Sequence, residues 1–106
     1  MKLSEENCRQ PKTGDLPLLP EETKNLIPDI PQWTLADKSI QREFSFKDFR
    51  QSMDFVNKVA ELAEKQNHHP DIFISYRKVK LVLSTHRVGG LTLNDFILAA
   101  KIDLLI

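Results

Sequence analysis

The sequence predicts an α+β fold: a four-stranded, mainly antiparallel sheet with helices packed on one face. Two stretches, residues 33–44 and 72–85, alternate apolar and polar side chains or are rich in β-branched and aromatic residues, as strands are. A long segment with apolar residues at helical spacing lies between them, and a shorter one follows the second. The sequence has neither the glycine-rich loop of a nucleotide-binding fold nor an internal repeat. The expected fold is therefore inferred from the order of the helices and strands.

The chain has 106 residues, which suits one domain with one hydrophobic core. We place this domain at residues 21–106. Residues 1–20 are polar, and Pro11, Gly14 and Pro17 interrupt any periodicity. We therefore expect an irregular N-terminal arm that lies on the domain or is partly disordered.

A short helix is expected to begin at Pro20, because proline suits the first helical position. The acidic residues Glu21 and Glu22 suit the positive end of the helix dipole. The helix should end before Pro28, because a proline disfavours helical backbone in the residue ahead of it.

A β-hairpin is expected after this helix. Trp33 and Leu35 alternate with polar neighbours in its first strand, and residues 36–38 form a polar turn. In the second strand, the side chains on one face recur at every second position: Ile40, Arg42 and Phe44.

The longest helix is expected from Ser45 to about Gln66. Ser45 and Asp48 have the spacing of a capping box, and Asn67 and Pro70 favour an end after Gln66. Apolar residues then recur every three or four positions, which predicts a buried stripe. This stripe contains Phe49, Met53, Val56, Ala60 and Ala63, and it is widened by Phe46, Phe55, Val59 and Leu62.

Residues 72–85 should form two strands that divide near Arg77-Lys78. In the second strand one face is apolar, with Val79, Leu81 and Leu83. Gly89-Gly90 predicts a turn, and Thr92 with Asp95 has the spacing of a second capping box. The last helix should follow, carrying Phe96, Ala99, Ala100 and Leu104.

Composition argues against several classes of function. Fifteen basic and fifteen acidic residues cancel, and no long basic run occurs, so direct binding of nucleic acid is not expected. No apolar run approaches the roughly 20 residues of a membrane span, so we expect no membrane association. The polar N-terminus lacks the apolar segment of a signal peptide, and the lone cysteine, Cys8, is interpreted as an incidental thiol. We therefore expect a cytoplasmic protein.

The three histidines are the candidate chemical groups. His68 and His69 follow the long helix, and His86 ends a strand ahead of the glycine turn. Three interpretations remain open from chemistry alone: solvated or structural histidines, a three-histidine zinc site, and metal-free acid–base catalysis. Zinc is the least favoured, because adjacent histidines point in different directions and no helical pair at i and i+4 exists.

The spacing of these histidines resembles the signature of the pterin-4a-carbinolamine dehydratase family. That pattern has a charged residue, three free positions, His-His-Pro, then an aromatic residue, a His or Trp, and an Asp. The matching residues here are Glu64, His68-His69-Pro70, Tyr76, His86 and Asp95. Likeness extends to Phe44–Phe49 and Leu83–His86 and covers residues 21–106.

This resemblance implies a reaction. Family members dehydrate a 4a-hydroxytetrahydropterin left by aromatic amino acid hydroxylases, and they yield the quinonoid dihydropterin without a metal or organic cofactor. His68 and His86 correspond to the acid–base histidines, and His69 corresponds to a histidine that orients or binds the pterin. Expelling hydroxide needs a proton donor and forming C=N needs a proton acceptor, so histidine suits both steps.

Further residues correspond to positions in the family's pocket, and two of them, Glu64 and Trp33, have a structural alternative as well. Glu64 is either a surface carboxylate or the group that holds a histidine tautomer. Trp33 either packs in the core or stacks on the pterin, and Gln32 replaces the family's usual glycine before it. The backbones of Ser84 and Thr85 are expected to contact the pterin.

Asp95 and Tyr76 each have a structural and a functional interpretation. For Asp95 we favour the role of helix-capping residue over direct substrate contact. Tyr76 we expect to pack on a strand rather than stack on the pterin.

The resemblance also implies partners. The family forms homodimers through sheet edges and, in some members, homotetramers through helix bundles. Animal members additionally act as dimerisation cofactors of a transcription factor, so a protein-binding scaffold is the alternative function.

Overall fold

A computed structural model describes residues 2–106. A 3-10 turn, Leu3–Glu5, precedes helix α1 (Pro20–Leu26) and a second 3-10 turn, Ile27–Asp29. The remaining elements are β1 (Thr34–Leu35), β2 (Ile40–Ser45), α2 (Phe49–Gln66), β3 (Asp71–Ser75), β4 (Lys78–Leu83), the 3-10 turn His86–Val88 and α3 (Leu93–Asp103).

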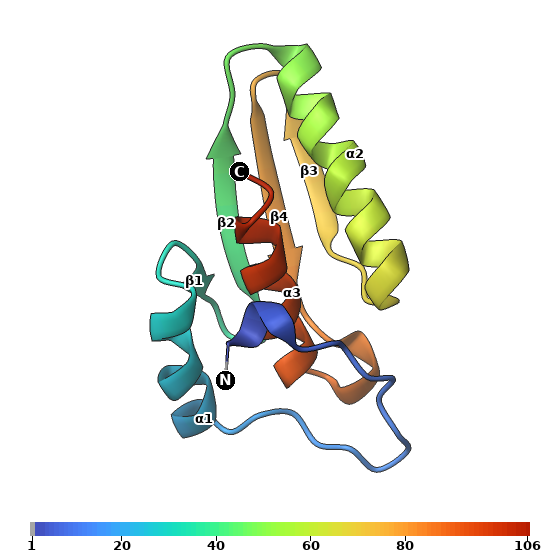
Figure 1. Ribbon diagram of the computed structural model, residues 1–106. Helices are drawn as coiled ribbons and strands as arrows, with labels where there is room; N and C mark the ends of the chain where they lie inside the picture. The colour runs from blue at the N-terminus through green and yellow to red at the C-terminus, as the bar shows by residue number, and fades with distance from the viewer. Residues whose placement is uncertain (1) are drawn as a thin grey trace.

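The four strands form one sheet in the order β1-β2-β4-β3, with every neighbouring pair antiparallel. In Figure 1, α2 and α3 lie across one face of this sheet. The expected α+β fold is therefore confirmed. Its two hairpins are β1–β2 and β3–β4, and the central strands β2 and β4 join them.

Alternation along the central strands directs one face into the core. Val79, Leu81 and Leu83 of β4 are fully buried, while Lys78 and Lys80 are exposed. On β2, Ile40 and Phe44 take the same face. Period-two burial is what a sheet with one covered face requires.

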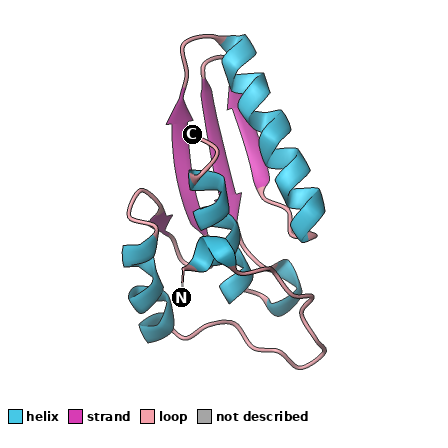
Figure 2. Ribbon diagram, viewed as in Figure 1, coloured by secondary structure: helices cyan, strands magenta, loops and turns pink. Residues whose placement is uncertain are grey.

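Helix α3 is buried almost all round, which places it between two layers. Its core residues are Phe96, Ile97, Leu98, Ala99 and Ile102. One side packs towards the sheet, and the 3-10 turn at Leu3–Glu5 contacts it on another side. Figure 2 shows that the rest of the connection to α1 is loop. A helix that is apolar on all sides needs such double cover.

The start of α2 differs from the prediction. Ser45 still belongs to β2 and pairs with Lys78, and the helix begins at Phe49. Asp48 is the N-cap, and its carboxylate accepts the Gln51 backbone N–H at 2.8 Å. Strand pairing continues through Ser45, so the next strong capping residue takes over.

The buried face of α2 is narrower than the predicted stripe. Phe55, Val59 and Ala63 are buried as predicted, together with Ser52, whereas Phe49 is 50% exposed and Ala60 is exposed. All the predicted positions satisfy helical spacing, so periodicity alone could not show which of them face the core. The contacts of Phe55 with Phe44 and Phe46 fix the rotation that the fold adopts.

Tyr76 lies in the β3–β4 turn and not on a strand as predicted. It is 64% exposed and has a positive φ of 54°. No helix within residues 2–106 is both long enough and apolar enough to cross a bilayer.

Candidate active site

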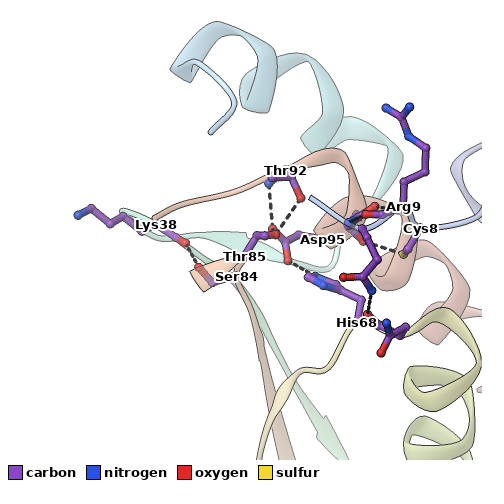
Figure 3. Close-up of polar contacts among 11 residues, drawn as sticks. Cys8, Arg9, Lys38, His68, Ser84, Thr85, Thr92 and Asp95 are labelled. Carbon is purple, nitrogen blue, oxygen red and sulfur yellow. Dashed lines mark hydrogen bonds and ion pairs between the residues drawn. The ribbon is translucent and has the colours of Figure 1, made fainter. Parts of the chain in front are cut away.

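A fully buried carboxylate, Asp95, organises the candidate site (Figure 3). Its Oδ2 atom accepts the Thr92 backbone N–H at 3.0 Å and the Thr85 hydroxyl at 2.8 Å. Its Oδ1 atom lies 2.6 Å from His68 Nε2. The hydrogen of the Thr85 hydroxyl is therefore used, and Thr92 donates to Thr85 across their 2.8 Å contact. One buried side chain thus caps α3 and holds two other elements.

His68 reaches Asp95 because α2 ends sharply before it. Asn67 adopts the left-handed conformation at φ 53°, which turns the chain after the last helical residue. The His68 backbone N–H then donates to Ala63 O at 3.2 Å. Its side chain is only 10% exposed.

The contact with Asp95 selects a tautomer of His68. A carboxylate can only accept hydrogen bonds, so Nε2 carries the hydrogen in this contact. Nδ1 is then the ring nitrogen with a free lone pair in the neutral imidazole. The arrangement leaves His68 able to take up a proton at Nδ1 and to return it.

His69 lies in a different environment. Its Nε2 atom is 2.5 Å from Glu64 Oε2, and the two side chains are 54% and 77% exposed. This pair joins the last turn of α2 to the loop that follows it. Because both groups are solvated, the contact orients the ring but contributes little to stability.

His86 begins the 3-10 turn after β4 and is exposed. It directly follows Thr85, whose hydroxyl shares the Asp95 carboxylate with His68. The Thr85 N–H donates to Gly90 O at 2.8 Å, and this bridge closes the loop that contains His86. Two hydrogen bonds and one peptide link therefore connect the backbone of His86 to the ring of His68.

Ser84 and Trp33 are placed away from this carboxylate. The Ser84 hydroxyl donates to Lys38 O at 2.7 Å, at the β1–β2 turn. Trp33 is 3% exposed, and its Nε1 atom donates to Asp103 at 2.8 Å. Asp103 is eight positions after Asp95, about 12 Å further along α3. Trp33 thus lies in the core, and the structure does not bring it to the histidines.

The sequence did not single out Gln66 or Asn94, which lie close to His68 and Asp95 in the chain and bind the N-terminal arm. Gln66 and Asn94 are polar residues on helices that are otherwise partly apolar. This contrast was the one feature of the sequence that could have pointed to them. A cavity of about 400 Å³ lies where the arm meets the start of α3, and none of the three histidines lines it.

No group of three or more His, Cys, Asp or Glu suited to a metal ion occurs within residues 2–106. The histidines instead pair separately, His68 with Asp95 and His69 with Glu64. The residues present therefore do not fit the three-histidine zinc site considered from the sequence.

Comparison with known proteins places these features in a family. Residues 16–105 match the family model described as pterin 4 alpha carbinolamine dehydratase. A provisionally named pterin-4-alpha-carbinolamine dehydratase of Rubrobacter xylanophilus is 44% identical over 96% of this chain and 96% of its own length.

Solved structures are also similar. The crystal structure of a transcriptional coactivator/pterin dehydratase from Brucella melitensis has a TM-score of 0.80 and 33% identity, over 84% of this chain and 97% of that one. A pterin dehydratase-like RuBisCO assembly factor of the α-carboxysome shares the fold alone, with a TM-score of 0.57 and 23% identity over 69% and 84% of the two chains.

Proposed function

The chain belongs to the pterin 4 alpha carbinolamine dehydratase family, and from this membership we propose that it removes water from 4a-hydroxytetrahydrobiopterin or a related pterin. The product is the quinonoid dihydropterin, so the enzyme recycles the pterin cofactor of aromatic amino acid hydroxylases. The proposal uses no metal or organic cofactor. The observation that supports it best is the buried Asp95–His68 pair, with Thr85 linking it to the loop of His86.

The chemistry needs two proton transfers. The C4a–O bond breaks as the hydroxyl oxygen gains a proton and leaves as water. The N5–H proton leaves, and its electron pair completes the C4a=N5 bond. A general acid and a general base near neutral pH each accelerate such steps by about 10²–10⁴-fold. We assign these transfers to His68 and His86, with His68 acting through Nδ1.

The remaining site residues have supporting roles in this proposal. Asp95 is fully buried, so it acts through His68 by fixing the tautomer and does not touch the pterin. Glu64 orients His69, which faces solvent and is available to bind the substrate. Ser84 and Thr85 supply the backbone that carries His86.

The test is a dehydration assay with a 4a-hydroxytetrahydropterin generated in situ. The unmodified protein should exceed the spontaneous rate, and His68→Ala and His86→Ala should each lose about 10²–10⁴-fold in kcat. Glu61→Ala, an exposed change on α2, is the control and should keep full activity. Near-normal turnover by His86→Ala would remove that residue from the mechanism.

A protein-binding scaffold is the second candidate, because the similar Brucella melitensis protein is described as a transcriptional coactivator as well as a pterin dehydratase. Purified protein distinguishes the two. Robust turnover supports the enzyme, whereas inert protein that co-purifies with a regulator supports the scaffold.

We also propose that the chain forms a homodimer or homotetramer in the cytoplasm. Strand β3 is an edge of the sheet, with Phe73 57% exposed and Ile74 41% exposed. An open edge of this kind pairs readily with a second strand.

A further inference from the structure

The N-terminal arm crosses the junction between the end of α2 and the start of α3. This is the junction that brings His68 to Asp95. The family model begins at residue 16, so Cys8, Arg9 and Gln10 lie outside the part of the chain that it matches. Figure 3 shows Cys8 and Arg9 on the α3 side of the pair.

On the α3 side, the arm is held by Asn94. Its Oδ1 atom accepts the Arg9 N–H at 2.9 Å, and its Nδ2 atom donates to Arg9 O at 2.6 Å. The Cys8 thiol also donates to Asn94 O at 3.5 Å. Asn94 is buried and directly precedes Asp95. One side chain therefore satisfies both backbone groups of Arg9, as a strand partner would.

On the α2 side, the arm is held by the residues directly before His68. Gln66 Oε1 accepts the Cys8 N–H at 2.8 Å, and Gln66 Nε2 donates to Asn7 at 3.2 Å. The Gln10 side chain donates to Asn67 O at 3.4 Å. Consecutive arm residues thus bind the last turn of α2 and the first turn of α3.

We propose that the arm is a positioning element for the His68–Asp95 pair, and that Asn94 is its principal positioning residue. The inference rests on the proposed dehydratase function and extends it to residues outside the family model. The arm binds both the end of α2 and the start of α3. It therefore fixes the separation of the His68 and Asp95 side chains, which must stay in hydrogen-bond contact. Misplacing a catalytic group by about 1 Å can cost 10²-fold in rate.

The test compares Asn94→Ala with the unmodified protein in dehydration and by ¹⁵N NMR of the His68 ring. We expect kcat to fall by about 10–100-fold while KM changes by less than about threefold. The His68 Nε2–H resonance should exchange with water at least about 10-fold faster, because its contact with Asp95 opens more often. Asn94→Asp keeps the acceptor for Arg9 N–H and loses the donor, so it should give intermediate values.

The matched control is Lys101→Ala. Lys101 Nζ donates to Ser4 O at 2.9 Å, so this change removes a different arm contact, about two helical turns further along α3 than Asn94. It should leave kcat and the His68 resonance unchanged. A loss equal to that of Asn94→Ala would mean that the arm only stabilises the fold, and the proposal would be overturned.

Gln66→Ala provides a second route if Asn94→Ala does not fold. Alanine is the best helix former, so α2 should persist while the Cys8 and Asn7 contacts are lost. The same changes in kcat and ring exchange are expected, and unchanged values overturn the inference. If the unmodified protein shows no dehydration, the proposed function fails, but the ring exchange still decides the role of the arm.

Discussion

At the scale of single residues, Asp95 has two tasks, of which the sequence predicted only the first. It accepts the Thr92 N–H as a helix cap and contacts His68 with its other oxygen. The capping interpretation followed from a spacing of three residues, which is local. The histidine contact joins positions 27 apart and depends on where α2 ends, so no local pattern could have predicted it.

Replacing Asp95 by Asn separates these tasks. The amide oxygen can still accept from Thr92 and Thr85, which turns the NH₂ group towards His68 Nε2 and favours the opposite tautomer. We expect kcat for dehydration to fall by about 10²–10⁴-fold. The variant should remain folded, which a cooperative thermal unfolding transition followed by circular dichroism would show. Full activity in the folded variant would contradict the role given to Asp95.

Cys8 offers a residue-scale test of the arm's packing. Burial, and then the nearby charge of Asp95, raise the pKa of Cys8 from 9.0 to about 11. The raised pKa means that the thiol keeps its proton to higher pH in the folded protein. At pH 8 the thiolate should be about 100-fold scarcer than in the unfolded chain.

Alkylation of Cys8 by iodoacetamide should therefore be about 100-fold slower in native protein than in urea, measured by mass spectrometry. The native rate should keep rising between pH 9 and 11, where the unfolded rate levels off. Equal rates in the two states would show that the arm does not pack around Cys8 in solution.

At the scale of elements, sequence patterns located each helix and strand but not their details. The order of elements and both hairpins were predicted, because alternation and helical spacing are properties of neighbouring residues. Which positions of α2 face the core was not predicted, because Phe49 and Phe55 both fit the wide apolar stripe. Contacts with Phe44 and Phe46 on and after β2 decide which one is buried.

The β3–β4 turn contains a backbone conformation that the sequence did not signal. Tyr76 has φ 54°, which usually calls for glycine. A side chain in this region costs about 1–2 kcal/mol, partly offset by the entropy that glycine loses on folding. Tyr76→Gly should therefore raise the free energy of unfolding by about 0.5–1 kcal/mol. Urea unfolding measures this, with Tyr76→Ala as the control that keeps the strain and should give no gain.

At the scale of the whole molecule, the fold and the proposed chemistry were predicted from different features of the sequence. The α+β arrangement followed from patterning, whereas the site needed the resemblance to a family, because chemistry alone left three interpretations of the histidines open. The arm shows what both kinds of reasoning missed. Its contacts join residues 58 and 85 positions apart in the sequence, and contacts at that distance form only in the folded chain.

The proposed assembly of the chain into oligomers can be tested at the open edge of the sheet. Phe73 is the central residue of edge strand β3, so an antiparallel pairing of two β3 strands centred on this residue would place a charge there opposite the same charge of the partner strand. Phe73→Arg should therefore shift the mass measured by light scattering from dimer to monomer. Leu16→Arg is the matched control, because Leu16 is 84% exposed on the arm and should not affect the mass. An unmodified chain that is monomeric at micromolar concentrations, or a Phe73→Arg dimer of unchanged mass, would rule out pairing through this edge.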